Sequence, residues 1–252
     1  MNYSELKEIW VKEEQLTFKG WDFSHLKDRW ESEDIPWDYK EILDKYIKKE
    51  YRLLDMGTGG GEFLLTLKHP YNNTAVTEKW EPNVKLCKET LEPLGIEVKQ
   101  VYKDEELPFA DSSFDIIINR HESYNAKEIK RILKSDGLFI TQQVGGENNG
   151  LLSRKVIKNF KPQFAENNLK NAVADLESEK FEILLKEESF PYSHFFDVGA
   201  VVYYCKVIEW EFPNFSVENC FEELCELQKE LEANGYVESL QHRFMIVAKN
   251  TK

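Results

Sequence analysis

The stretch Leu53-Leu54-Asp55-Met56-Gly57-Thr58-Gly59-Gly60-Gly61-Glu62-Phe63-Leu64-Leu65 decides the fold of this chain. Residues 51–56 form a predicted apolar strand, and residues 62–68 carry leucines at helical spacing. The glycines between them allow a tight turn and leave backbone N–H groups exposed at a helix N-terminus. Turns of this kind bind nucleotide-like ligands at the carboxyl end of the first strand of an α/β sheet. The predicted cofactor contacts on this loop are Asp55, Gly57, Gly59 and Gly61.

The spacing of the glycines argues against the common phosphate-binding motifs. A dinucleotide fingerprint would need its third glycine at Glu62, and a Walker A loop would need a Gly-Lys-Ser/Thr ending, which is not there. The pattern is instead an acid, Asp55, followed by glycines at alternate positions. It resembles motif I of the class I S-adenosylmethionine-dependent methyltransferases, and the acid suits a ligand with a cationic amino group. A tight turn without a ligand is the alternative for the loop taken alone.

A second acid stands where a ribose anchor is expected. Residues 73–77 form a predicted strand that ends in Glu78, about 20 residues after the first glycine of the loop. A carboxylate can accept hydrogen bonds from both ribose hydroxyls, so one residue would fix the sugar. Lys79 follows directly and joins the cofactor-binding candidates. An exposed acid at a strand end is the structural alternative.

Length and charge limit the classes of function. The chain has 252 residues and a formal net charge of −13, and its length suits one α/β domain with additions. The acidic balance disfavours nucleic acid, because binding to a phosphate backbone depends on Lys and Arg. No apolar run approaches the roughly 18 residues of a membrane helix, and the N-terminus lacks the apolar core of a signal peptide. We therefore expect a cytoplasmic protein with a small-molecule substrate and no membrane partner.

The four cysteines show neither a Cys-x-x-Cys pair nor a histidine at metal-binding spacing. They predict reduced thiols and no metal site.

The remaining periodicity extends the α/β pattern. Further strands are predicted at residues 96–101, 114–119, 138–144, 181–190 and 236–249, with a turn at 135–137 and helices between the strands. A βαβ series that closes with two strands matches the methyltransferase fold. The expected fold class is thus α/β, a seven-stranded Rossmann-like sheet with an antiparallel last strand and helices on both faces. Residues 50–252 would form one methyltransferase domain, and residues 1–49 an N-terminal extension packed on it.

The N-terminal extension is rich in aromatic residues. After an amphipathic helix predicted over residues 2–17 come Trp21, Phe23, Trp30 and Trp37, outside any periodic pattern. They would serve either as a clasp that packs the extension on the core or as a lid over the site. Asp38 is the predicted N-cap of a helix over residues 39–49.

Two further stretches carry the family resemblance. Leu107-Pro108-Phe109 resembles the segment before strand four of methyltransferases, where an aspartate accepts a hydrogen bond from the adenine amino group. Lys103 occupies the matching position and Asp104 follows it, so either Asp104 or backbone groups would make this contact. Trp21-Asp22-Phe23-Ser24, Pro36-Trp37-Asp38-Tyr39, Phe196-Asp197-Val198-Gly199-Ala200 and Trp210-Glu211-Phe212-Pro213 resemble a group of uncharacterised bacterial methyltransferases, which brings no settled substrate.

Catalytic candidates follow the predicted strand 114–119. Asn119 ends that strand at the edge where chemistry would occur, and His121 and Glu122 come next. Methyl transfer needs a base only if the acceptor loses a proton, and His121, Glu122 and His194 are the candidates. Tyrosines at 124, 203 and 204 are candidate positioning groups. Packing in the core is the structural alternative for each of these side chains.

The sequence supports an S-adenosylmethionine-dependent methyltransferase that acts on a small molecule. Within the enzyme class the alternative is an RNA base methyltransferase, which the acidic charge disfavours. A non-catalytic protein that binds S-adenosylmethionine or S-adenosylhomocysteine would carry the same glycine loop and Glu78. A nicotinamide oxidoreductase does not fit the glycine spacing.

Overall fold

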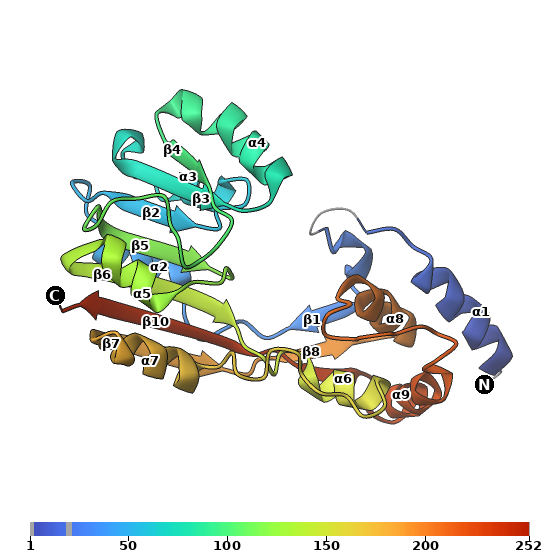
Figure 1. The fold of residues 1–252 in the computed structure, drawn as a ribbon. Coiled ribbons are helices and arrows are strands. Elements are labelled where there is room, and N and C mark those ends of the chain that lie inside the picture. The colour runs from blue at the N-terminus through green and yellow to red at the C-terminus, as the bar shows by residue number, and fades with distance from the viewer. Residues whose placement is uncertain (1–2, 19–21, 252) are drawn as a thin grey trace. The chain divides into compact units, whose positions relative to one another are not determined.

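A computed structural model describes residues 3–18 and 22–251 of the chain. They form two compact units, and each is built from separate parts of the sequence (Figure 1). Unit 1 comprises Met1–Ile35, Gly145–Asn167 and Ser189–Arg243. Unit 2 comprises Pro36–Val144, Asn168–Glu188 and Phe244–Lys252. The expected division into an extension of residues 1–49 and a domain of residues 50–252 stays a prediction.

Unit 2 is organised around a mixed seven-stranded sheet, which confirms the predicted fold class. Its strands, in the order in which they pair, are β4 (Glu97–Gln100), β3 (Thr74–Glu78), β2 (Leu53–Met56), β5 (Phe114–Arg120), β6 (Leu133–Val144), β10 (Arg243–Asn250) and β7 (Phe181–Ser189). The strands from β4 to β6 pair in parallel, and the arrow of β10 points the opposite way (Figure 1). The chain order reverses at β2, so ligands are expected at the carboxyl ends of β2 and β5.

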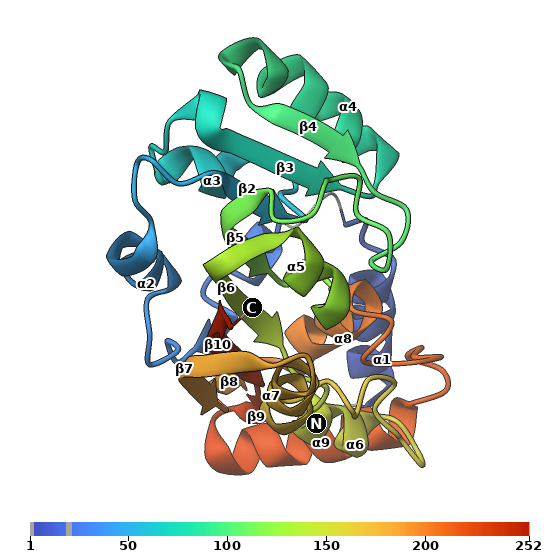
Figure 2. The ribbon, with the colours of Figure 1, turned by 60° about the vertical axis from the view of Figure 1, so that its left-hand side comes forward.

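Alternating side chains of these strands build two apolar layers. One layer packs α2 (Tyr39–Tyr46), α3 (Glu62–Thr66) and α4 (Glu81–Thr90) on the sheet through residues such as Leu43, Leu64 and Cys87. The other packs α5 (Ala126–Ile132) and α7 (Leu169–Ser178) through Ile129 and Leu176. Figure 2 shows α2 and α5 on opposite sides of the sheet. Short 3-10 helices η2 (Tyr71–Asn73) and η3 (Glu92–Leu94) precede β3 and β4.

Two local predictions in unit 2 have clear outcomes. Asp38 caps α2 as predicted, because its carboxylate accepts a hydrogen bond of 3.0 Å from Glu41 N. The turn predicted at residues 135–137 is wrong: these residues lie inside β6, at an irregularity in its pairing with β5. Asp136 has a φ of +62°, a left-handed conformation typical of turns, although it lies within the strand.

Unit 1 has its own core. Its helices are α1 (Tyr3–Glu14), the 3-10 helix η1 (Ser24–Leu26), α6 (Gly150–Val156), α8 (Val198–Val207) and α9 (Phe221–Asn234). They pack with a three-stranded antiparallel sheet of β1 (Trp30–Ser32), β8 (Tyr192–Phe195) and β9 (Val237–Leu240). The sequence does not predict this sheet, because its strands are only three or four residues long and come from distant segments. The strand predicted over residues 236–249 is divided into β9 and β10.

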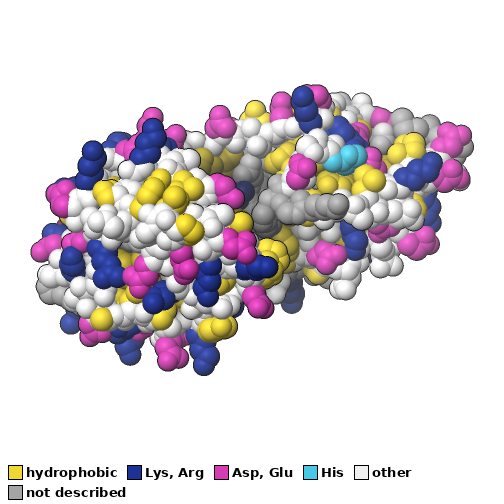
Figure 3. All heavy atoms as spheres, turned by 90° about the horizontal axis from the view of Figure 1, so that it is seen from above, with side chains coloured by type: hydrophobic (Ala, Val, Ile, Leu, Met, Phe, Trp, Pro, Cys, Tyr) yellow, Lys and Arg dark blue, Asp and Glu magenta, His cyan; other side chains and the backbone are white. Residues whose placement is uncertain are grey.

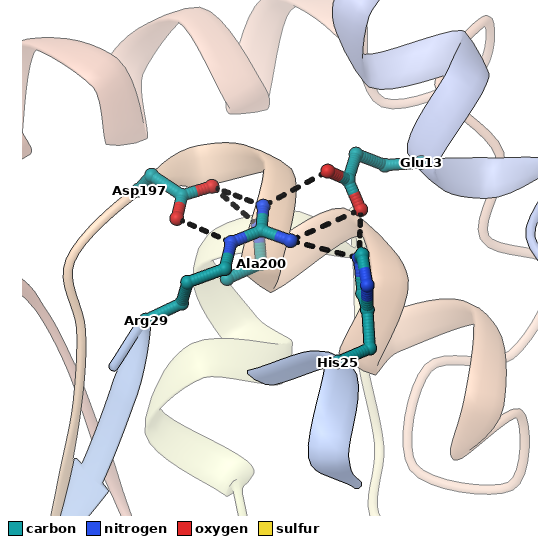
Figure 4. Close-up of polar contacts among 5 residues, drawn as sticks. All are labelled: Glu13, His25, Arg29, Asp197 and Ala200. Carbon is teal, nitrogen blue, oxygen red and sulfur yellow. Dashed lines mark hydrogen bonds and ion pairs between the residues drawn. The ribbon is translucent and has the colours of Figure 1, made fainter. Parts of the chain in front are cut away.

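One arginine ties three segments of unit 1 together (Figure 4). Arg29 donates from Nε and Nη2 to the carboxylate of Asp197, at 2.8 and 2.6 Å, and from Nη2 to Glu13 Oε1 at 3.0 Å. Asp197 is also the N-cap of α8 and accepts from Ala200 N at 2.7 Å. His25 contacts both Arg29 and Glu13. These bonds hold α1, the start of β1 and α8 in a fixed arrangement.

The aromatic residues of the N-terminal extension are divided between the units. Trp21 lies outside the described residues. Phe23 and Trp30 pack on Tyr204 of α8, with ring centroids 6.2 and 5.9 Å apart, whereas Trp37 belongs to unit 2. For Phe23 and Trp30, these contacts fit a clasp within unit 1, and a lid over the site stays a prediction.

No helix in the described ranges is long and apolar enough to cross a membrane.

Candidate functional site

The glycine loop lies at the carboxyl end of β2, as the sequence predicts. Gly57 N and Thr58 N donate to Thr77 O of β3 at 3.0 and 3.2 Å, and Gly61 N donates to Thr58 O at 3.0 Å. The Thr58 hydroxyl donates to Asp55 Oδ2 at 2.7 Å. The loop is therefore held both by the next strand and by its own acid.

Glu78 is bonded directly to the glycine loop. Its Oε2 accepts from Gly59 N at 2.8 Å, and its Oε1 accepts from Lys79 N and Trp80 N at 2.9 and 3.1 Å. An ionised carboxylate has about four acceptor positions, so three backbone donors leave room for a further partner. The two predicted halves of the cofactor site thus meet in one hydrogen bond.

The three alternate glycines have different surroundings. A Cβ on Gly57 would lie 2.6 Å from Cβ and Cγ of Glu122, and a Cβ on Gly61 would lie 2.8 Å from a methyl carbon of Leu91. A Cβ on Gly59 would meet no atom of the described residues within 4 Å, although its φ is +63°. Gly57 and Gly61 are therefore required by neighbouring side chains, whereas Gly59 leaves an open face that a ligand could approach.

Asp55 is only 5% exposed, and burial raises its pKa to about 7. The hydrogen bond from Thr58 and the charge of Arg120 act in the opposite direction, and the charge of Glu78 adds to the rise. Near neutral pH the group is consequently poised between the protonated and ionised forms. A cationic ligand group nearby would favour the ionised form.

A pocket opens beside the loop, and four of the eight predicted cofactor residues line it. Its lining consists of Met56, Gly57, Thr77, Glu78, Lys79, Val101, Asp104, Leu107, Glu122 and Ser123. Asp104 thus lies in the same pocket as Glu78, while the neighbouring Lys103 is exposed and does not line it.

Asn119 anchors a buried polar network at the end of β5. Its Oδ1 accepts from Thr141 Oγ1 at 3.0 Å and from Gln143 Nε2 at 2.6 Å. Gln143 Nε2 also donates to the Glu122 backbone oxygen at 2.9 Å, which fixes the segment after β5. Asn119 is fully buried, and its Nδ2 has no hydrogen-bond partner among the residues that the structure describes. An unsatisfied buried donor is costly, so a ligand acceptor near it would be stabilised.

His121 stands at the same strand end in a restricted conformation. Its φ is +65°, and its backbone N donates to Gln142 O at 2.8 Å. Gln142 also links two side chains, because its Oε1 accepts from Trp37 Nε1 at 2.8 Å and its Nε2 lies 3.3 Å from His121 Nε2. The chain from Trp37 through Gln142 orients the imidazole of this candidate base.

The remaining catalytic and positioning candidates pack against aromatic residues of their own unit. His194 belongs to unit 1, where it stacks between Tyr192 and Tyr236 at centroid distances of 4.2 and 3.8 Å. Tyr203 and Tyr204 are on α8 and pack in the core of unit 1. Tyr124 packs edge-on against Phe139 of unit 2. The contacts of these tyrosines and of His194 fit the packing alternative.

Sequence reasoning missed several residues that shape the site. Cys87 of α4 donates its thiol to Gly59 O at 3.1 Å, and burial, with the charge of Glu78, raises its pKa to about 11. Tyr39 donates to the backbone oxygens of Asn119 and Ile140 at 3.1 and 3.2 Å. The polar Gln142-Gln143 pair at the end of an apolar strand is the one signal that could have pointed to this network.

Comparisons with known proteins agree with this geometry. Residues 54–141 match the model of a family described as a methyltransferase domain. That segment begins at β2 and ends in β6, so it contains the loop, Glu78, Asp104 and Asn119. Residues 54–141 of the chain are therefore similar to a methyltransferase domain.

Two curated relatives are methyltransferases by name. The uncharacterized methyltransferase YcgJ of Bacillus subtilis is 30% identical over 103 residues, which cover 37% of this chain and 40% of that protein. The ribosomal protein L11 methyltransferase of Caldicellulosiruptor saccharolyticus is 33% identical over 138 residues, covering 50% of this chain and 42% of that protein. The chain therefore spans about two fifths of the length of each relative.

Solved structures share the fold of the methyltransferase domain. The alignment with the crystal structure of YcgJ covers 85% of this chain and 98% of the YcgJ chain, with a TM-score of 0.57 and 17% identity. The alignment with the crystal structure of the [4+2]-cyclase SpnF covers 84% of this chain and 79% of the SpnF chain, with a TM-score of 0.51 and 14% identity. Since a protein described as a cyclase has this fold too, the fold alone does not identify the reaction.

We expect Asp55 to make the stability of the protein depend on pH. Because its folded-state pKa is raised, the stability it contributes is present at low pH and is lost as the pH rises through about 7. Asp55→Asn keeps an oxygen that can accept from Thr58 but cannot ionise. When the pH is raised from 5 to 8, the free energy of unfolding should fall in both proteins. The fall should be roughly 3 kcal/mol smaller in the variant than in the wild type. Urea unfolding at both pH values measures this, and equal losses would show that Asp55 is ionised throughout.

The open face of Gly59 predicts a selective loss of ligand binding. Gly59→Ala would place a methyl group where no protein atom lies, at a strain of about 1–2 kcal/mol from its positive φ. Gly95→Ala is a matched control, because Gly95 also has a positive φ and open surroundings but precedes the amino end of β4. Both variants should lose similar stability in thermal melting. Only Gly59→Ala should weaken S-adenosylmethionine binding in calorimetry, and equal affinities would contradict the assignment.

Proposed function

We propose that the protein is an S-adenosylmethionine-dependent methyltransferase with a small-molecule acceptor. The observation that carries the proposal is the hydrogen bond from Gly59 N to Glu78, an acid that lines the pocket together with Gly57 inside the family-matched segment. Neither a tight turn without a ligand nor an exposed acid at a strand end accounts for an open glycine face beside a buried carboxylate with spare acceptor positions.

Six of the predicted cofactor residues have roles that their surroundings fit, while Gly57 and Gly61 make room for Glu122 and Leu91. Glu78 would accept from the ribose hydroxyls, Gly59 would allow the ligand to reach the backbone, and Asp104 would accept from the adenine amino group. Asp55 and Asn119 would face the amino-acid end of the cofactor, and Lys79 would lie at the rim of the pocket.

When bound, the cofactor supplies a methyl group on a positively charged sulfur. The chain's own contribution is to hold the acceptor in line with that group and to keep water away. Where the acceptor must lose a proton, His121 and Glu122 are the candidate bases, because they follow β5 next to the pocket. His121 is the better oriented of the two through Gln142.

Charge favours a small acceptor over RNA. The net charge is −13, and on the face shown in Figure 3 the acidic and basic side chains are interspersed. A phosphate backbone would need clustered Lys and Arg.

The direct test of function is transfer of a labelled methyl group. The protein is incubated with methyl-labelled S-adenosylmethionine and size-fractionated cell extract. We expect label in the small-molecule fraction. Label in RNA would contradict the acceptor class, and binding without any transfer would favour the non-catalytic alternative.

Glu78 should contribute strongly to cofactor affinity. Glu78→Ala should weaken binding by about 1.5–3 kcal/mol, the usual range for hydrogen bonds to a charged group. Glu105→Ala is the control. It removes the same charge from a residue that is exposed and does not line the pocket. Isothermal calorimetry measures both affinities, and a loss below about 0.5 kcal/mol would place the ribose elsewhere.

A further inference from the structure

Glu122 lies directly against the first glycine of the loop. A Cβ on Gly57 would be 2.6 Å from Glu122 Cβ and 2.9 Å from its Oε2, distances that no real Cβ tolerates. The missing side chain at position 57 is therefore what lets Glu122 reach the pocket. There its side chain shares the lining with Glu78 and Asp104.

The Glu122 carboxylate is half-buried and makes no hydrogen bond or ion pair with any residue that the structure describes. Burial raises its pKa, and the charges of Glu78 and Asp104 raise it further. A carboxylate that has lost part of its hydration without gaining a partner is unfavourable. A cation brought by a ligand would supply the missing partner.

The basic residue of the pocket does not cancel this charge. Lys79 opposes the rise in the pKa of Glu122, but Lys79 is exposed to solvent. Water and salt screen an exposed charge far more than a buried one. The pocket beside Gly57 therefore has a negative potential that acts on whatever ligand enters it.

We propose that Glu122 is a specificity-determining residue, which makes the pocket bind S-adenosylmethionine in preference to S-adenosylhomocysteine. This inference rests on the proposed function. The donor and its demethylated product differ by one methyl group and one positive charge on sulfur. A half-buried carboxylate beside the loop favours the charged form, so the product is released more readily than the donor.

Glu122 could instead only fill space above Gly57, and two variants separate these roles. Glu122→Gln keeps the size of the side chain and removes its charge, whereas Glu122→Ala removes both. Glu105→Gln is the matched control, because it removes an exposed charge nearby. Thermal melting checks that each variant is folded.

The experiment is calorimetric titration of each protein with S-adenosylmethionine and, separately, with S-adenosylhomocysteine. We expect Glu122→Gln to bind the donor about tenfold more weakly, on the scale of one partly screened charge contact, with product affinity unchanged. Glu105→Gln should bind both ligands as the wild type does.

Several results would overturn the inference. Equal weakening of donor and product by Glu122→Gln would mean that Glu122 contacts a group common to both ligands. Unchanged affinities in Glu122→Gln, with tighter binding of both ligands by Glu122→Ala, would show a purely steric role. If the wild type binds neither ligand, the proposed function itself fails. If it binds both and the variants keep their ratio, only this inference fails.

Discussion

The site depends on the hydrogen bond from Gly59 N to Glu78 Oε2. The two residues meet because β2 and β3 pair in parallel, with Asp55 opposite Val76 and Met56 opposite Thr77. Parallel pairing brings the carboxyl ends of both strands to the same edge, so residues 19 positions apart in sequence come into contact. The bond gives a charged acceptor to a loop N–H and gives the carboxylate a fixed direction, which orders the loop before any ligand arrives.

The ordered loop brings three acidic side chains close together. Asp55 lies beneath the loop, Glu78 bonds to it, and Glu122 packs on its first glycine. The charge of Glu78 raises the pKa of both other acids, after the larger effect of burial. Keeping such groups close in a partly dry site is unfavourable without a counter-charge. The ligand that relieves this repulsion best is a cation, and S-adenosylmethionine carries a positive sulfur and an amino group.

The sequence predicts unit 2 far better than unit 1, for a physical reason. The strands of unit 2 are apolar runs that alternate with helices, and glycines or prolines end them, so each element is recognisable within a short window. Unit 1 is assembled from three distant segments, and its sheet consists of strands of three or four residues. Its key contact, Arg29 with Asp197, spans 168 positions. The sequence does not predict the network around Asn119 for a similar reason. Gln143 and Tyr39 form hydrogen bonds with Asn119, which is distant in sequence, and no local pattern specifies such a partner.

The glycine loop shows the limit of arguing from residue type. In the sequence Gly57, Gly59 and Gly61 are equivalent members of one motif, and each suggests a backbone that a ligand touches. In the structure Gly57 makes room for Glu122 and Gly61 for Leu91, whereas a Cβ on Gly59 would meet no atom of the described residues within 4 Å. The motif here therefore combines two requirements: one glycine with open surroundings, and two that let an acid and a helix pack against the loop. Because Glu122 comes from the segment after β5, the first glycine of the loop and the catalytic candidates His121 and Glu122 belong to one packed structure.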